Sequence, residues 1–312
     1  MTRIRKQQER VAVCLKWMDK EVCLGVYKVS SSKGITLKDK VLDVLKIFNK
    51  VAHIKYIVTD TTSFNTGHTS GAVHLLQEVL KNAKYIECRH HVMELLLSDL
   101  FKTVLNFKTK SPEFKNCFIW KFLSNFEEFY KGYRCSALGP SSDEFVSRFY
   151  TTTLTLTGDY KELNDLASAI YFGEEVTVKG LGVVHHARWM AKAICCLKLW
   201  LLLPKVGLEM DQVDRLKSLV YFIVLIYNPR WQKSREIAKE GDESFEKALI
   251  KFGNAEILSK WRKHKPRFYP VEKYIEATND CAERALGKWP NFYKKTTKEN
   301  RRQMLIFNSY FL

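Results

Sequence analysis

The sequence predicts an α/β protein in which a mixed β-sheet is followed by a largely helical region. Three observations indicate this fold class. Strand-like and helix-like segments alternate over the first third of the chain, aromatic-rich helical segments dominate the middle, and helical periodicity returns near the end. A chain of 312 residues with 46% apolar residues is long enough to bury a sizeable core.

The chain begins with a predicted β-hairpin and an amphipathic helix. The stretches RVAVCLKWM at 10–18 and VCLGVYKVS at 22–30 predict two strands that a short turn at Asp19 and Lys20 joins. After the polar loop SSSKG, the apolar spacing predicts a helix with Thr36 as its N-cap. Its apolar face carries Leu37, Val41, Val44, Leu45 and Phe48.

The next strand places an acid at its end. The run IKYIVT at 54–59 predicts a strand, and Asp60 follows it directly. A helix over 72–83, a short strand over 84–88 and a further helix that opens at or just after the histidine pair of CRHHVMELLL complete the alternation. Functional groups in such sheets lie at the carboxyl ends of strands, which makes Asp60 a candidate site residue.

The middle of the chain is predicted to be mostly helical. Helices dominate from about Ser111 to Arg267, apart from two strand-like stretches, TTTLTLTG and EVTVKGLGVV. The most apolar windows, ICCLKLWLLLP and SLVYFIVLIYN, run about ten residues, roughly half of a membrane span, and predict buried helices without membrane contact. The terminal stretch RRQMLIFNSYFL predicts a helix. We expect three segments, at 1–110, 111–267 and 268–312.

The charge balance indicates a polyanionic partner. Lys and Arg number 51 against 34 Asp and Glu, which leaves a formal net charge of +17. This favours nucleic acid over an acidic membrane surface, although basic charge also keeps proteins soluble. The eight cysteines have no framework spacing, and the first residues are charged where a signal peptide needs an apolar run, which favours a reducing compartment.

Three kinds of chemistry are open to the polar motifs. Cys88, His90 and His91 could join His185 and His186 around zinc, but no second CxxC or HxxxH pair completes a four-ligand site. A cysteine near histidine could also support acyl transfer. Alternatively, acids from distant parts of the chain could hold Mg²⁺ or Mn²⁺ for phosphoryl transfer. An aspartate at a strand end is also commonly an ordinary cap or turn residue.

One segment resembles the part of hAT-superfamily transposases, and of transposase-like proteins related to them, that carries the second acid of a DDE site. It reads TDTTSFNTGHTSGAVHLLQEVL and then CRHHVMELLL, which matches the approximate pattern D-T-T-x-x-N-T-G-x-x-x-G-A followed by C-R-H-H and a helix. Two further blocks match in the same order. HHARWMAKAI at 185–194 resembles the R-W segment, and NDCAERALGKW at 279–289 resembles the block with the final glutamate.

The resemblance extends from about residue 10 to the end, with a poor match between Pro229 and Pro270. It implies an RNase H-like core interrupted by the helical segment and Mg²⁺- or Mn²⁺-dependent DNA cleavage and strand transfer. Asp60 and Glu283 would then be the second and third metal-binding catalytic acids.

Further residues take roles from the same resemblance. Cys88 and His91 would be the CxxH pair that supports the site's geometry and DNA contacts. Arg188 would contact a phosphate, and Trp189 would stack on a base or, equally, pack in the core. The implied protein is nuclear and binds DNA. Its C-terminal region would pair with another copy of the chain or pack on its own core.

The chain departs from the family pattern at its start. The first acid of the family lies on a central strand upstream of the hairpin, whereas here MTRIRKQQER resembles only the link before that hairpin. We therefore expect this strand, its aspartate and the zinc-binding BED-type domain to be absent, with Asp19 a poor substitute. A sheet without its central strand would expose unpaired backbone groups.

Two main interpretations follow from these residues. The chain is an hAT-like transposase whose chemistry is impaired, or it is a catalytically silent, transposase-derived protein that binds DNA. A protein that binds RNA is a third interpretation, although no RNP or KH motif supports it.

Overall fold

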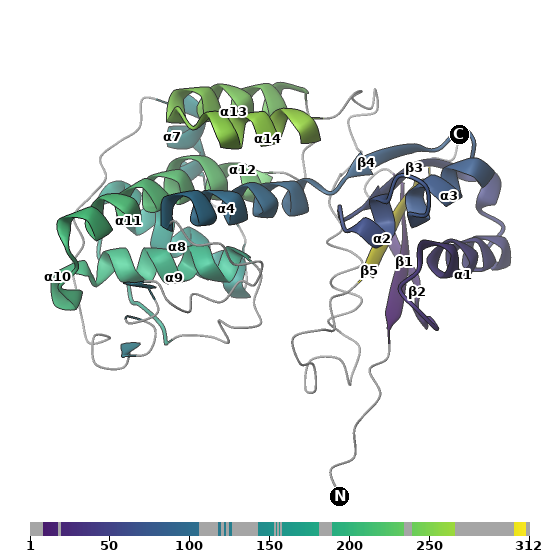
Figure 1. The fold of residues 1–312 in the computed structure, drawn as a ribbon, viewed down its shortest axis with the longest axis horizontal. Coiled ribbons are helices and arrows are strands. Elements are labelled where there is room, and N and C mark those ends of the chain that lie inside the picture. The colour runs from purple at the N-terminus through teal and green to yellow at the C-terminus, as the bar shows by residue number, and fades with distance from the viewer. Residues whose placement is uncertain are drawn as a thin grey trace, which may run out of the picture. The chain divides into compact units, whose positions relative to one another are not determined.

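The computed structural model describes residues 9–17, 20–105, 118–119, 122, 125–126, 143–152, 154, 156, 158–180, 189–233, 239–265 and 303–309. The chain divides into two compact units (Figure 1). The sheet unit comprises Met1–Val92, Ser234–Gly241 and His264–Leu312, and the helical unit comprises Met93–Lys233 and Asp242–Lys263. The three segments expected from the sequence stay a prediction.

The sheet unit is built on a five-stranded mixed sheet in the order β2-β1-β5-β3-β4. Its strands are β1 (Arg10–Trp17), β2 (Lys20–Lys28), β3 (Ile54–Thr59), β4 (Lys84–Glu87) and β5 (Gln303–Ser309). The β1/β2 and β3/β5 pairs are antiparallel, whereas β1/β5 and β3/β4 are parallel. The α/β class and the four strands expected in the first third are confirmed.

The strand at the centre of the sheet is the one that the sequence did not predict. Gln303–Ser309 forms β5 between β1 and β3, so the helix expected over RRQMLIFNSYFL is wrong for these residues. A continuous apolar run such as MLIF does not distinguish a helix from a strand with neighbours on both sides. Because β5 pairs with both neighbours, the backbone groups of β1 and β3 that face it have partners.

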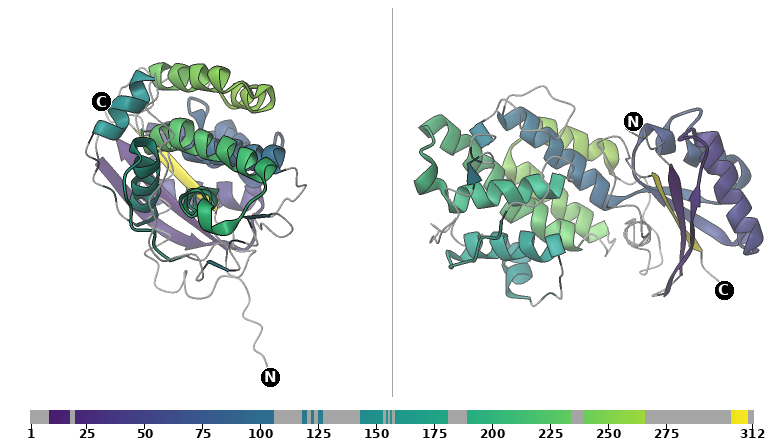
Figure 2. Two further views of the ribbon diagram at one scale, coloured as in Figure 1. Left: turned by 90° about the vertical axis from the view of Figure 1, so that its left-hand side faces the viewer. Right: turned by 90° about the horizontal axis from the view of Figure 1, so that it is seen from below.

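Helices α1 (Gly34–Ile47) and α3 (Ala72–Val79) pack on one face of this sheet (Figure 2). Side chains from one face of β1 meet them, because successive residues of a strand point to opposite faces. The shared core includes Val11, Val13, Leu15, Leu37, Val41, Leu45, Ala72, Val73 and Leu76. Because α3 belongs to this core, the loop after β3 leads the chain to this face of the sheet.

Two details of the predicted first helix are wrong. The helix begins at Gly34 after Lys33, and Thr36 lies inside it, where its hydroxyl is 2.9 Å from the hydroxyl of Ser31. Phe48 follows the helix and is 42% exposed, so it is not part of the buried face. The other four predicted face residues, Leu37, Val41, Val44 and Leu45, are buried as expected.

Short elements connect the remaining parts of the sheet unit. A 3₁₀-helix, η1 (Val51–His53), precedes β3, and a single turn, α2 (Ser63–Thr66), follows it. Helix α4 (Arg89–Leu105) begins one residue before the histidine pair, close to the predicted start, and its later residues belong to the helical unit.

The helical unit contains α7 (Glu144–Thr151), α8 (Gly158–Phe172), α9 (Trp189–Leu201), α10 (Leu203–Val206), α11 (Met210–Phe222), the π-helix η3 (Ile223–Tyr227), α12 (Asn228–Lys233), α13 (Lys239–Phe252) from Asp242 onward and α14 (Ala255–His264) up to Lys263. Both apolar windows form buried helices as predicted, in α9 and in α11 with η3. The strand-like stretches TTTLTLTG and EVTVKGLGVV contain no strand in their described residues. Of the helices in the described ranges, none combines the length and the apolar composition that a membrane span requires.

The π-helical turn η3 has a cause in the sequence. Pro229 lacks a backbone N–H, and its ring crowds the carbonyl four residues earlier, at Leu225. The Leu225 carbonyl instead accepts a hydrogen bond from Arg230 Nη1 at 3.0 Å, and the Val224 carbonyl accepts one from the Tyr150 hydroxyl at 2.6 Å. Side chains therefore satisfy the carbonyls that the widened turn leaves without helical partners.

Arg230 is the centre of a buried polar cluster beneath this turn. It is 4% exposed, and its Nη2 lies 3.0 Å from Asp143 Oδ2. Asp143 also caps α7, because its Oδ1 accepts a hydrogen bond from the Phe145 N–H at 3.0 Å. Burial lowers the pKa of Arg230, and the neighbouring Asp143 carboxylate opposes that shift. The ion pair thus keeps a charged guanidinium inside the helical unit.

Candidate functional site

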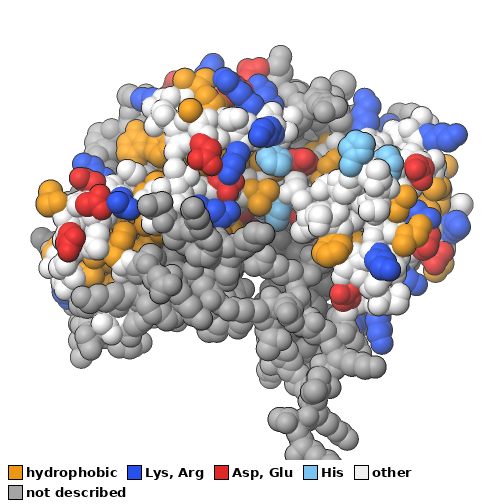
Figure 3. All heavy atoms as spheres, viewed as in Figure 1, with side chains coloured by type: hydrophobic (Ala, Val, Ile, Leu, Met, Phe, Trp, Pro, Cys, Tyr) orange, Lys and Arg blue, Asp and Glu red, His pale blue; other side chains and the backbone are white. Residues whose placement is uncertain are grey.

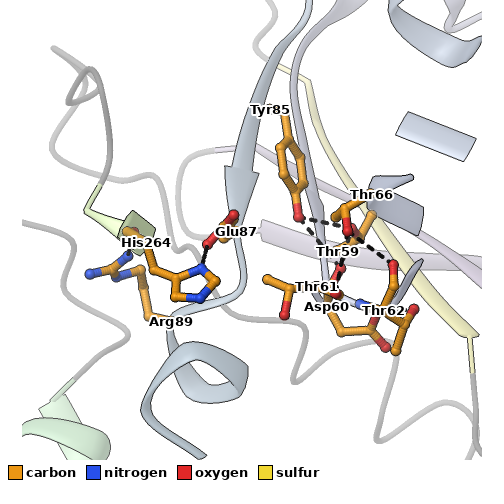
Figure 4. A network of polar contacts seen from close by, with 9 residues as sticks. All are labelled: Thr59, Asp60, Thr61, Thr62, Thr66, Tyr85, Glu87, Arg89 and His264. Carbon is orange, nitrogen blue, oxygen red and sulfur yellow. Dashed lines mark hydrogen bonds and ion pairs between the residues drawn. The ribbon is translucent and has the colours of Figure 1, made fainter. Parts of the chain in front are cut away.

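Asp60 closes the loop at the carboxyl end of β3. Its side chain is nearly buried, with 6% of the residue exposed. Oδ1 accepts hydrogen bonds from the Thr62 N–H at 3.0 Å and the Thr62 hydroxyl at 2.6 Å (Figure 4). It also accepts one from the Asn65 amide at 2.8 Å. Hydrogen bonds to a carboxylate are stronger than neutral ones, so this single oxygen organises the turn that leads into α2.

The two glycines of the same motif allow a close approach of the backbone to itself. The Gly71 N–H donates to the Gly67 carbonyl at 2.9 Å. A Cβ atom on Gly71 would lie 2.4 Å from the Gly67 nitrogen and 2.6 Å from its oxygen, and both of these are backbone atoms. The G-x-x-x-G spacing is therefore a packing requirement, and α3 begins immediately afterwards at Ala72.

Backbone and side-chain contacts tie this loop to the next strand. The Thr59 hydroxyl donates to the Asp60 carbonyl at 2.8 Å, and the Tyr85 hydroxyl of β4 reaches the same carbonyl at 3.4 Å. Burial raises the pKa of Tyr85 far above its ordinary value, so its hydroxyl remains a donor. The Cys88 N–H donates to the Thr59 carbonyl at 2.8 Å, which joins the ends of β3 and β4.

A second polar group lies where β4 runs into α4. Nδ1 of His264 is 2.7 Å from Glu87 Oε2, and Figure 4 shows the imidazole facing that carboxylate. Arg89, which is 2% exposed, donates from Nη1 to the His264 carbonyl at 3.2 Å. No sequence pattern predicts this pairing, because His264 stands in the basic stretch KWRKHKPR, 177 residues from Glu87.

The same basic stretch is less available to a polyanion than its composition suggests. Lys260 lies 2.7 Å from Asp99 and 3.4 Å from Glu256, and these carboxylates raise its pKa against the effect of burial. Arg262 lies 2.9 Å from Glu246. On the face in Figure 3, Lys and Arg side chains are scattered over the described surface of both units and mixed with Asp and Glu. No single basic patch dominates the described part of this face.

The predicted site residues fall in different places. Asp60, Cys88 and His91 belong to the sheet unit, and Cys88 is fully buried. Trp189 begins α9 in the helical unit, where its ring centroid is 5.6 Å from that of Phe101. This contact is what the core-packing interpretation of the tryptophan expects. Arg188, Glu283, His185 and His186 lie outside the described residues.

A divalent metal would find one open ligand atom at Asp60. Oδ1 already accepts three hydrogen bonds, whereas Oδ2 accepts none from the described part of the chain. Among the described residues, no group of three or more His, Cys, Asp or Glu side chains could hold a metal ion. These residues alone therefore do not fit a Mg²⁺ or Mn²⁺ site.

No protein-family model, curated protein or solved structure matches this chain, so its function has to be argued from its own residues.

Proposed function

We propose that this protein is a transposase-derived, nuclear DNA-binding protein with an RNase H-like sheet, related to the hAT superfamily. The observation that carries the proposal is the motif that follows β3. Its aspartate, threonine and asparagine are joined by hydrogen bonds, and its glycines allow close backbone contacts within the same loop. The residues that carry the resemblance therefore form one compact loop in the structure. The net charge of +17 supplies the affinity for a polyanion.

The structure supports binding over catalysis at Asp60. The carboxylate oxygen Oδ1 serves the loop, and within the described residues no group of three or more His, Cys, Asp or Glu side chains could hold a metal ion. A role in shaping the loop needs only one carboxylate. Binding to DNA needs cationic surface, and on the face in Figure 3 the described residues of both units supply Lys and Arg side chains in dispersed form.

A DDE-type enzyme remains the second candidate function. Oδ2 of Asp60 accepts no hydrogen bond from any described residue, and Asp60 stands at the carboxyl end of a strand. In this alternative, Asp60 and Glu283 would hold Mg²⁺ or Mn²⁺ for cleavage of DNA.

Equilibrium binding to a duplex DNA at several salt concentrations tests the first proposal. Each phosphate contact adds about 0.9 to the slope of log affinity against log salt, so we expect a slope steeper than about −4. A single-stranded RNA and an uncharged polymer serve as competitors. Salt-independent binding, or tighter binding to the RNA at every salt concentration, would contradict the assignment to DNA.

Nicking of supercoiled plasmid in the presence of Mn²⁺ separates the two candidates. Asp60→Asn keeps an oxygen for the three loop donors but removes the carboxylate charge, and Asp43→Asn removes one acid from the exposed side of α1 as a matched control. The binding proposal expects no nicking by any of the three proteins. Nicking that Asp60→Asn abolishes and Asp43→Asn retains would establish the enzyme instead.

A further inference from the structure

Two cysteines face each other across the β1/β2 hairpin. Cys14 and Cys23 are register partners in this antiparallel pair. Opposite residues of antiparallel strands have Cα atoms about 4.5 or 5.5 Å apart, and disulfides span Cα separations of about 4.4–6.8 Å. The backbone therefore already holds the two residues at a separation that a disulfide requires, while neither of these two cysteines is in a disulfide in the structure.

A β-bulge creates this pairing. Val13 pairs with Gly25 and Cys14 pairs with Cys23, which leaves Leu24 as the extra residue on β2. Gly25 has φ of 151°, a conformation that residues with a side chain rarely adopt. Without the bulge, the register would change by one residue and Cys14 would face Leu24. The glycine thus determines which residue stands opposite Cys14.

The two thiols differ in access to solvent. Cys14 is fully buried on β1, whereas Cys23 is exposed on β2. A hydrogen bond with the Cys14 thiol is the largest influence on Cys23 and lowers its pKa to about 6, although partial burial and the Glu21 carboxylate oppose the shift. A thiol with this pKa is mostly thiolate at neutral pH, and the thiolate is the reactive form.

Cys195 in α9 gives the contrast within the same chain. It is buried, and burial raises the pKa of its thiol to about 11 despite the nearby Lys192 and Lys198. Such a thiol is protonated at neutral pH and shielded from oxidants.

We propose that Cys23 is a peroxide-sensitive thiol and that Cys14 is its resolving partner, so that a hydroperoxide converts the pair into a cross-strand disulfide. The Cys23 thiolate attacks one oxygen of the hydroperoxide, the O–O bond breaks, and an alcohol or water leaves after taking a proton. The Cys14 sulfur then attacks the sulfenic acid on Cys23, the S–O bond breaks, and the hydroxyl leaves with the Cys14 proton as water. Two thiols and one hydroperoxide give one disulfide, one alcohol or water and one further water.

The disulfide would have a local structural effect. β1 pairs with β2 on one side and with β5 on the other. A covalent bond between Cys14 and Cys23 would hold the β1/β2 edge together, and a thiol reductant would release it.

Peptide mapping of the full-length protein tests the proposal. The reduced, folded protein is treated with one equivalent of hydrogen peroxide, blocked with an alkylating reagent and digested with trypsin. Lys16 and Lys20 lie between the two cysteines, so a Cys14–Cys23 disulfide appears as the linked peptides VAVCLK and EVCLGVYK. We expect this pair to form before any other cysteine is oxidised, and dithiothreitol to separate it. The same treatment in urea is the control, in which the preference should disappear.

Two variants assign the roles. In Cys14→Ala, a sulfenic acid should accumulate on Cys23 and react with dimedone, and the pH midpoint for alkylation of Cys23 should rise. In Cys23→Ser, at an exposed position, Cys14 should stay reduced. At pH 7 we expect Cys23 to be alkylated at least about a hundredfold faster than Cys195. Equal alkylation rates, or peroxide oxidation of other cysteines before Cys23 in the folded protein, would overturn the proposal.

Discussion

The two units bury polar groups in different ways. In the sheet unit, the partners of the Asp60 side chain are Thr62 and Asn65, the latter only five positions along the chain. In the helical unit, Arg230 pairs with Asp143, which is 87 positions away. The Asp60 loop can form from its own sequence, whereas the Arg230 cluster can form only when α7 and α12 come together. Local partners leave a motif in the sequence, and distant partners do not.

The largest expected effect comes from breaking the distant pair. Asp143→Ala removes the counter-ion of a guanidinium that is 4% exposed and also removes the N-cap of α7. Loss of one partner of a buried ion pair costs about 3–5 kcal/mol of unfolding free energy. Urea unfolding of the full chain, followed by circular dichroism, measures this loss.

Asp143→Asn separates the two contributions to that loss. Asparagine still caps a helix well, so this variant should lose the ion pair but keep the hydrogen bond from the Phe145 N–H. We expect most of the destabilisation to remain in Asp143→Asn. A loss below about 1 kcal/mol would show that Arg230 does not depend on this carboxylate.

The next largest effect concerns the close backbone contact in the motif loop. Gly71→Ala would place a Cβ atom 2.4 Å from a backbone nitrogen, and backbone atoms cannot move aside as a flexible side chain can. We expect a loss of about 3 kcal/mol, at the upper end for overpacking. The same urea titration measures it.

Gly180→Ala is the matched control for Gly71→Ala. A Cβ atom at Gly180 would meet no atom within 4 Å, so the stability should stay within about 0.5 kcal/mol of the unchanged protein. Similar losses in both variants would mean that the G-x-x-x-G spacing is not a packing requirement.

A smaller effect is expected at Asp60 itself. Asp60→Ala leaves the buried Asn65 amide and the Thr62 donors without their shared acceptor, which should cost about 2 kcal/mol. Asp60→Asn still offers an oxygen in the same place and should cost less than about 1 kcal/mol. Thermal and urea unfolding of both variants measure the difference. If Asp60→Asn lost as much stability as Asp60→Ala, the charge and not the hydrogen-bonding geometry would hold the loop.

The same contrast explains what the sequence could predict. The four early strands and the buried face of α1 follow from local periodicity, and Asp60 lies at the end of β3 as expected. β5 was missed because its place is fixed by β1 and β3, which are far away in the chain. A four-residue apolar run carries no information about that pairing.

The polar contacts that the sequence did not predict also join residues far apart in the chain. Glu87 meets His264 across 177 positions, and Arg230 meets Asp143 across 87. Neither pair has a spacing that a sequence motif could reveal. Even the cysteine pair of the hairpin required the register, because only the bulge beside Gly25 places Cys23 opposite Cys14.

The smallest expected effect comes from an exposed ion pair between near neighbours, which serves as the comparison for the buried, distant pair of Arg230 and Asp143. Lys161 and Asp165 form an ion pair four residues apart on α8, with Nζ 2.7 Å from Oδ2 and side chains that are 54% and 39% exposed. Asp165→Asn should cost less than about 0.5 kcal/mol, because water solvates both charges when the pair is broken. The contact is as short as the one at Arg230 and lies in the same unit, so the two variants differ mainly in burial and in separation along the chain. If Asp165→Asn lost as much unfolding free energy as Asp143→Asn, the buried position of Arg230 would add nothing to the contribution of its ion pair. A small loss at Asp165 beside a large one at Asp143 would show that the helical unit depends on contacts that form only on packing.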